Sequence, residues 1–334
     1  MTRMSTWLAR PAVRPLLLLL VVVAGLLLAD GAQGRVWSAA TAYSVLQQFA
    51  TLGPLALALG LTMMAREFDL SIGGTLSLAG CVAVLAGTTS PLLGLMLAVA
   101  LGATAGLVQS GLMLRVGLGS ISVTLGGLLV LSGLAYVVTN NETISYARSD
   151  VVAAVNDRVG GVFSWRSLLA LAVFALAEFV VSWTRIGRDL LAVGSDRRAS
   201  ATAGVPVTAI LCGTFAVAGM LAAGSGALLS FSLAAASPLA LADTLAPAAA
   251  AAIVGGVSLQ GGRGRPLGIA AGALVLCVLR SGLTAMGVAP CVHDIATGAV
   301  LLAVAFADSD DLRMRWHLLW RRAQPRRPIT PSNT

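Results

Sequence analysis

Residues 55–87 read LALALGLTMMAREFDLSIGGTLSLAGCVAVLAG, and this stretch decides the fold class. Two apolar runs are separated only by residues 66–74, where three charged side chains precede a pair of glycines. Charged side chains are costly at membrane depth, and glycine weakens a helix. The break therefore predicts either a broken or re-entrant segment buried in protein, or a turn at the membrane surface in which Asp69 or Ser71 caps the next helix. Both descriptions can hold together.

The composition of the whole chain is that of a membrane protein. Of its 334 residues, 57% are hydrophobic and 11% are charged, and the mean hydropathy is +0.89. A typical soluble domain has about 25% charged residues. All 22 basic residues are arginine, so no lysine is available for a Schiff base or a phosphate-binding loop, and we do not expect this chain to hydrolyse nucleotides. The four cysteines lack CxxC spacing, and we expect no disulfide framework, no metal site and no cofactor.

A helix that crosses about 30 Å of hydrocarbon needs roughly 20 mostly apolar residues. We therefore predict an all-α integral membrane protein with about ten transmembrane helices and broken, glycine-rich segments. Residues 1–307 would form one polytopic domain, and residues 308–334 an arginine- and proline-rich tail. The predicted spans are 13–29, 43–65, 71–89, 91–114, 120–138, 166–183, 207–231, 244–258, 267–284 and 291–307.

The arginines predict the orientation, because short cytoplasmic loops retain positive charge. With ten spans both termini share one side, and that side carries 17 arginines against four on the other, with Arg280 inside a span. We therefore predict that both termini and residues 184–206 are cytoplasmic and that loop 139–165 is external. The same asymmetry explains the pI of about 10.6 without nucleic acid, and the basic tail is expected to be a positive-inside anchor at the lipid bilayer. Arg280, an intramembrane charge, is expected to be functionally sensitive.

Two further stretches are unusual for membrane helices. Residues 255–268 (GGVSLQGGRGRPLG) lack the GK[ST] ending of a phosphate-binding loop, which argues against a nucleotide site. GGTLS at 73–77 and GGVSL at 255–259 are alike, which indicates an internal repeat of the kind that transporters use. Residues 184–206 mix charged and small side chains, and this fits either a short helix that docks on a partner or a solvated loop.

At these three stretches the chain resembles the permease subunits of ribose-type ATP-binding cassette (ABC) importers, a group that includes the ribose, galactofuranose, rhamnose and autoinducer-2 permeases. FDLSIGG (68–74) resembles their Ile-Asp-Leu-Ser-Val-Gly-Ser, and AAIVGGVSLQGGRG (251–264) resembles their Ala-Val-Val-x-Gly-Gly-Thr-Ser-Leu-x-Gly-Gly-x-Gly. TRIGR (184–188) and the AVG and AGV that follow are similar to their cytoplasmic Thr-x-x-Gly-Arg, Ala-x-Gly and Ser-Gly-Ile elements. The matches keep the family's order over approximately residues 40–307.

The resemblance implies a non-catalytic permease subunit in the plasma (bacterial inner) membrane that moves a small sugar or sugar-like solute. Its implied partners are a cytoplasmic ABC ATPase, a periplasmic or external sugar-binding protein, and a second permease copy or paralogue. By position, coupling to the ATPase falls on Gly187, Arg188, Ala192, Gly194, Ala203 and Gly204. The candidate translocation-path or motif residues are Asp69, Ser71, Gly73, Thr75, Gly255, Gly256, Ser258 and Arg280, of which Thr75 and Arg280 rest on their polar chemistry alone.

Departures from the family pattern limit what the resemblance transfers. Arg280-Ser281 replaces an Asn-Asn pair of the ribose-type members, so the identity of the sugar is not carried over. Residues 197–199 (RRA) replace a Glu-Ala-Ala run, which leaves the partner surface open. We expect a bulky residue at Gly194 to uncouple ATP hydrolysis while leaving the chain folded.

Other functions remain open on the sequence alone. Within the importer class the alternative is a branched-chain amino acid ABC permease. An ion-coupled secondary transporter would need intramembrane ionisable residues, for which the candidates are Glu178, Arg280, His293 and Asp294. An intramembrane enzyme would have only the pair His293-Asp294. Hydroxyl and amide groups of Ser71, Thr75, Ser77 and Gln109 would recognise a sugar if they face its path, and interhelical hydrogen bonds explain them equally.

Overall fold

The computed structural model describes residues 13–36, 38–239 and 244–308, and the chain there is mostly helical. The longer helices are α2 (Val13–Asp30), α3 (Ala39–Met64), α4 (Ile72–Gly87), α5 (Pro91–Val116), α6 (Ser120–Val138), α8 (Trp165–Trp183), α11 (Val207–Ser232), α13 (Pro266–Ala285) and α14 (Pro290–Asp308). The shorter ones are η1 (Gly31–Gln33), α7 (Ser149–Asn156), α9 (Arg185–Ser195), α10 (Arg197–Thr202) and α12 (Leu245–Val254). The predicted tail from residue 309 onward lies outside the described residues.

Six of these helices are long and apolar enough to cross a membrane: α3, α5, α6, α8, α11 and α13. Four other apolar helices, α2, α4, α12 and α14, are shorter in the residues searched. Large apolar side chains stay exposed on the outer helices, for example Leu129 at 68% and Val137 at 72% on α6. Such a surface suits lipid better than water, and it agrees with a membrane protein that crosses the bilayer several times.

The predicted span 244–258 is wrong as a single helix. Helix α12 has 10 residues and ends at Val254, and at about 1.5 Å per residue it is about 15 Å long. That is about half of the roughly 30 Å of hydrocarbon in a bilayer. The chain leaves the helix at Gly256, whose φ of 86° is a left-handed conformation that favours glycine. The glycine-rich loop that follows leads to α13.

Two long helices, α3 and α11, each pack against helices from the other half of the sequence. Helices α3 and α11 both have 26 residues. Helix α11 packs mainly against α4 and α5, whereas α3 packs mainly against α11 and α13 and, next, against α12. The α5–α11 crossing is close because the Gly102 and Gly219 backbones touch: a Cβ at Gly102 would lie 2.1 Å from the Gly219 oxygen. Small residues allow such close backbone contact between membrane helices.

The two similar glycine motifs are not structurally equivalent. Residues 73–77 lie within α4, whereas residues 255–259 lie beyond the end of α12. The observed correspondence is therefore between long helices that exchange packing partners, and the short GG motifs do not mark it.

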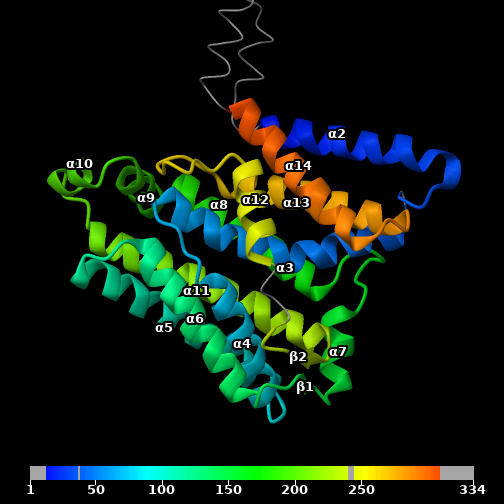
Figure 1. Ribbon diagram of the computed structural model, residues 1–334, viewed down its shortest axis with the longest axis horizontal. Coiled ribbons are helices and arrows are strands. Elements are labelled where there is room, and N and C mark those ends of the chain that lie inside the picture. The colour runs from blue at the N-terminus through cyan, green and yellow to red at the C-terminus, as the bar shows by residue number, and fades with distance from the viewer. Residues whose placement is uncertain (1–12, 37, 240–243, 309–334) are drawn as a thin grey trace, which may run out of the picture.

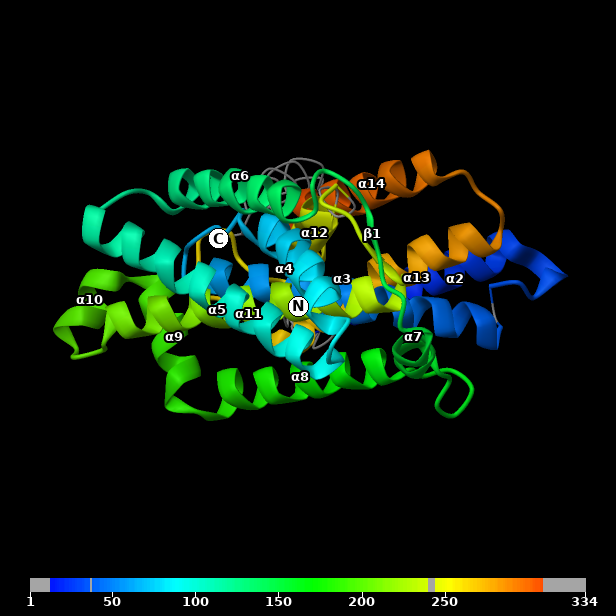
Figure 2. The same cartoon turned by 90° about the horizontal axis from the view of Figure 1, so that it is seen from below.

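The two ends of the molecule differ in structure. Helices α9 and α10 form the left end in Figures 1 and 2, and α7 lies on the right. At the α7 end, β1 (Ile144–Ser145) pairs antiparallel with β2 (Ala235–Ala236). The hydroxyl of the buried Tyr146 donates to the Gly87 carbonyl oxygen at 3.0 Å. These contacts fold loop 139–165 onto the helices.

Candidate transport cavity and motif junction

The three sequence motifs meet at the α9–α10 end, in what we call the motif junction: residues 64–71, 193–197 and 261–264. The Gly262 N–H donates to the Met64 carbonyl oxygen at 2.9 Å. A Cβ at Gly194 would lie 1.8 Å from the same oxygen, and a Cβ at Gly261 would lie 2.5 Å from the Arg66 Cβ. Only glycine permits backbones to approach this closely. The three motifs therefore form one tightly packed backbone contact.

The segment after α3 is a buried turn. The Arg66 N–H donates to the Met63 oxygen and the Glu67 N–H to the Thr62 oxygen, each at 2.9 Å, and Arg66 has a φ of 62°. This is the Schellman pattern that ends helices. The Asp69 carboxylate then accepts hydrogen bonds from the Ser71 N–H at 2.9 Å and the Ser71 hydroxyl at 2.6 Å. The structure shows a turn whose Glu67 and Asp69 side chains are buried, so the two descriptions drawn from the sequence hold together. Asp69 bonds to Ser71 before α4, whereas no side chain caps that helix at Ser71.

The turn is anchored to neighbouring helices through polar groups. The Gln109 amide of α5 donates to the Ser71 hydroxyl oxygen at 2.7 Å, and the Thr124 hydroxyl of α6 donates to the Phe68 carbonyl at 3.1 Å. Arg197, next to α9, forms an ion pair with Glu67. Asp69 is 1% exposed, and this burial raises the pKa of its carboxyl to about 6, although the bonds from Ser71 act in the opposite direction.

The hydroxyl candidates of this region make hydrogen bonds within the chain. The Thr75 hydroxyl donates to the Ser71 carbonyl at 3.0 Å, so both residues belong to the turn and the first part of α4. Gly73 is buried beside α6, next to Gly74, whose Cβ would lie 2.8 Å from the Leu128 oxygen.

The candidate coupling residues divide into buried and exposed groups. Gly187 and Gly194 are buried, and a Cβ at Gly187 would lie 2.0 Å from the Val181 oxygen. Arg188, Ala203 and Gly204 are exposed, whereas Ala192 is half-buried. The expectation that a bulky residue at Gly194 leaves the chain folded is therefore wrong, because that site already touches the backbone of α3.

The second glycine motif packs α12 against α13. A Cβ at Gly255 would lie 2.5 Å from the Gly268 oxygen. The Ser258 N–H donates to the Arg263 carbonyl at 3.1 Å and closes the loop that carries Gly261 and Gly262.

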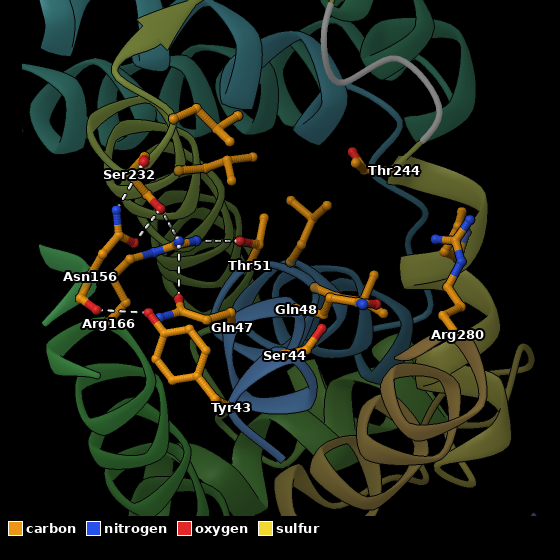
Figure 3. A pocket seen from close by; sticks show the side chains of 15 residues that line it. Tyr43, Ser44, Gln47, Gln48, Thr51, Asn156, Arg166, Ser232, Thr244 and Arg280 are labelled. Carbon is orange, nitrogen blue, oxygen red and sulfur yellow. Dashed lines mark hydrogen bonds between the residues drawn. The ribbon is translucent and has the colours of Figure 1, made fainter. Parts of the chain in front are cut away.

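A polar cavity of about 490 Å³ lies elsewhere, toward the α7 end. Its walls come from α3, α8, α11, α12 and α13, with α7 contributing Asn156 (Figure 3). The lining residues are Tyr43, Ser44, Gln47, Gln48, Thr51, Leu52, Leu55, Asn156, Arg166, Leu229, Ser232, Leu233, Thr244, Pro247 and Arg280. Ligand pockets commonly measure about 300–1,000 Å³, so a monosaccharide-sized solute fits.

One wall of the cavity is a hydrogen-bonded network around Arg166, drawn with dashed lines in Figure 3. Its guanidinium donates to the Ser232 hydroxyl and the Thr51 hydroxyl, both at 2.6 Å, and to the Gln47 amide oxygen at 3.2 Å. The Asn156 amide N–H₂ donates to the Ser232 carbonyl at 3.0 Å. The network therefore ties α3, α7, α8 and α11 together at the cavity.

Arg280 lies across the cavity from Arg166 in Figure 3. Its guanidinium donates to the Asp294 carboxylate at 2.7 Å, and 29% of its side chain is exposed. Of the path and motif candidates drawn from the sequence, Arg280 lines the cavity, while the others belong to the motif junction, to α4 or to the α12–α13 contact.

The sequence analysis missed most residues of this cavity. Tyr43, Ser44, Gln47, Gln48 and Thr51 recur at the helical spacing i, i+1, i+4, i+5 and i+8 within an otherwise apolar span. A polar face with the 3.6-residue period was the available signal. Arg166 is one of the four arginines that the sequence analysis assigns to the external side, where it has no predicted role in a site.

Comparison with known proteins identifies the family. The model of the family described as "Branched-chain amino acid transport system / permease component" matches residues 41–305. The chain belongs to this permease family. That confirms the resemblance to importer permeases, and it supports a transport subunit.

Relatives of this permease carry import functions in their names. It is 30% identical to the fructose import permease protein of Rhizobium meliloti, over 84% of this chain and 80% of the relative. It is 29% identical to the ribose import permease protein of Escherichia coli K12, over 80% and 85%. It is 31% identical to an autoinducer 2 import system permease protein of Klebsiella pneumoniae, over 82% and 85%. No solved structure matches the permease significantly.

Proposed function

We propose that the chain is the membrane-spanning permease subunit of an ABC importer for a small sugar or sugar-like solute. An external binding protein delivers the solute, separate cytoplasmic subunits hydrolyse ATP, and a second permease copy or paralogue completes the path. The observation that carries this proposal is the polar cavity of about 490 Å³ in a chain whose relatives import fructose, ribose and autoinducer 2. Amide and hydroxyl groups are the ones that bind sugar hydroxyls.

The proposed topology has about ten membrane crossings, one of them made by the short α12 together with the glycine-rich loop after it, and places both termini and the α9–α10 end in the cytoplasm. The asymmetry of 17 arginines against four supports it. The α7 end, with the cavity, then faces the external binding protein. Single-cysteine labelling in a cysteine-free background tests this orientation. Asp157→Cys should react with an impermeant reagent from outside, and Ser195→Cys, which is also exposed, should react only after permeabilisation.

Coupling in this proposal runs from α9 through the motif junction. The buried face of α9 contains Leu190, Val193 and Gly194, while Ile186 is 60% exposed and Arg188 is exposed too. An ATPase that displaces α9 would also displace Met64, because Gly194 touches it. The ends of α3 and α4 would follow, and α3 carries the polar wall of the cavity.

The alternatives receive less support from the cavity. An amino acid has an ammonium group that needs a carboxylate or several acceptors, and proton or sodium coupling needs an ionisable residue in the path. Among the described lining residues the charged ones are Arg166 and Arg280. Glu178, one of the candidates for ion coupling, is engaged with Arg265 and with the Leu267 N–H.

Reconstitution tests the proposal. Proteoliposomes that contain the permease, its ATPase and its binding protein should take up labelled solute only with ATP. Arg188→Glu should reduce substrate-stimulated ATP hydrolysis, and Arg115→Glu, an exposed change near the same end of the molecule, should not. Uptake by the permease alone, driven by an ion gradient, would defeat the importer proposal.

A further inference from the structure

The cavity has positive charge without a matching negative charge in its described lining. Arg166 and Arg280 line it, and no Asp or Glu is among its described lining residues. Arg280 has the carboxylate of Asp294 as a partner, although 74% of the Asp294 side chain is exposed. Arg166 has no acidic partner in the part of the chain that the structure describes. Its side chain is therefore the stronger source of unneutralised charge.

Burial makes the charge of Arg166 expensive. The residue is 5% exposed, and its acceptors are two hydroxyls and one amide oxygen, all neutral. An unpaired buried cation carries a desolvation penalty that neutral hydrogen bonds offset only in part. A hydrophobic or neutral residue could tie α3 to α8 without that penalty. Retaining a guanidinium here thus points to a role for its charge.

The helix dipoles do not neutralise it. Arg166 is the second residue of α8, where the partial charge of the helix end is positive and disfavours a cation. Ser232 is the last residue of α11, so a negative helix end lies nearby. Each helix end is equivalent to about half a unit charge, and the two oppose each other. Most of the arginine charge therefore remains available to a ligand.

The unsatisfied atoms of this wall are donors. Arg166 Nε and Gln47 Nε2 are buried and have no hydrogen-bond partner. The Gln47 amide oxygen accepts from Arg166, which fixes its N–H₂ as the free end. Two free donors beside a cation require an acceptor, and an anionic oxygen satisfies both the hydrogen bonds and the charge.

A third arginine adds positive potential beside the cavity. The Arg158 guanidinium carbon lies 4.6 Å from the centre of the Tyr43 ring, and Tyr43 is a lining residue. Positive clefts with low-dielectric walls concentrate anionic solutes.

We propose that the cavity binds an anionic sugar, a monosaccharide that carries a carboxylate or a phosphate ester, with the anionic group at Arg166 and Gln47. The inference rests on the proposed function and deepens it by assigning a substrate class. The sugar hydroxyls would face Ser44, Gln48 and Thr51. Arg280 closes the opposite wall.

Binding to the full-length permease in nanodiscs of neutral lipid tests the inference without other subunits. Isothermal titration compares solutes that differ in charge: D-ribose with D-ribonate, D-glucose with D-gluconate, and D-ribose with D-ribose 5-phosphate. The anionic member should bind at least about tenfold more tightly, since a desolvated charge contact is worth that much or more. The stronger of ribonate and ribose 5-phosphate identifies the anionic group. Equal binding within every pair, or binding of neither member, overturns the inference.

Variants then assign the preference to Arg166. Arg166→Gln should reduce the anion-to-neutral ratio to about one, and Arg166→Lys should retain part of it because the charge remains. Arg148→Gln is the matched control, since Arg148 pairs with Asp150 in the same external segment. If Arg166→Gln does not fold, the ratio of anion to neutral-solute affinity in Arg166→Lys and in the wild type still tests the assignment. An unchanged ratio in folded Arg166→Gln would overturn the assignment.

The outcome is separable from the importer proposal. ATP-dependent uptake of neutral sugars, together with nanodisc binding that ignores charge, would leave the importer standing and remove the anionic substrate. Anion binding in nanodiscs together with uptake that needs no ATPase would support the anionic substrate and defeat the importer proposal.

Discussion

The motif junction and the cavity are built by opposite means. At the junction, glycines bring three backbone segments into contact, and the sequence there resembles a known family. At the cavity, side chains from five helices of the bundle and from α7 surround open space, and no contiguous motif marks them. Most polar groups described at the junction bond to one another, although Arg197 Nε there has no partner, as is also true of Arg166 Nε and Gln47 Nε2 at the cavity. The contiguous motifs thus mark a packed backbone contact, whereas the cavity is lined by residues that are scattered along the chain.

The largest expected effect comes from adding a side chain at the motif junction. Gly194→Ala places a methyl group 1.8 Å from the Met64 oxygen, so α9 must move away from α3. We expect a loss of about 3 kcal/mol or more, or failure to accumulate in the membrane. Gly213→Ala, in α11 with nothing within 4 Å of the new Cβ, should be neutral or slightly stabilising. Thermal unfolding in detergent measures both, and equal melting temperatures would contradict the close packing.

A change in the cavity should reduce transport, and it should cost less stability than filling the junction. Thr51→Val keeps the shape and removes the hydroxyl that accepts from Arg166 at 2.6 Å. A hydrogen bond to a charged group is worth about 1.5–3 kcal/mol, so uptake should fall about tenfold or more. Thr104→Val is the control, because its exposed hydroxyl bonds only within α5. Reduced membrane abundance together with normal uptake per molecule would place Thr51 among the structural residues.

The ion pair between Glu67 and Arg197 should show a measurable coupling. A double-mutant cycle with Glu67→Gln and Arg197→Gln is expected to give about 1 kcal/mol, since Glu67 is buried and Arg197 is 39% exposed. The pair Arg148–Asp150, exposed on both sides, should give a value near zero in the same cycle. Unfolding in detergent of the variants at both ion pairs measures the two coupling energies. A larger coupling energy at the exposed pair than at the Glu67–Arg197 pair would contradict this prediction.

A further expected effect is a pH dependence of stability at the turn. The pKa of Asp69 is raised from 3.8 to about 6 by burial, so the native state holds this proton more tightly than the unfolded state. Stability should therefore decrease as the pH rises from about 4 to about 6. Asp69→Asn keeps an oxygen that accepts from Ser71 and should remove this contribution. Melting temperatures of both proteins at several pH values test it, and parallel profiles would refute it.

Much of the fold was predictable from the sequence because hydrophobicity acts locally. Each predicted span overlaps an apolar helix, and the break at 66–74 coincides with the end of α3 and the start of α4. Helix ends were less predictable. The span at 244–258 was wrong because backbone conformation at Gly256, rather than hydropathy, ends α12.

The sequence by itself determined the membrane character, the family and the arginine asymmetry, since composition and short motifs need no knowledge of contacts. Only the tertiary structure showed that Gly194 is a packing residue, because its neighbour Met64 is far away along the chain. Only the tertiary structure placed Gln47 and Ser232 on one guanidinium. A cavity is a property of helices that meet after folding, so only the polar face of α3 has a spacing that a linear pattern can reveal, and the lining residues from other helices have none.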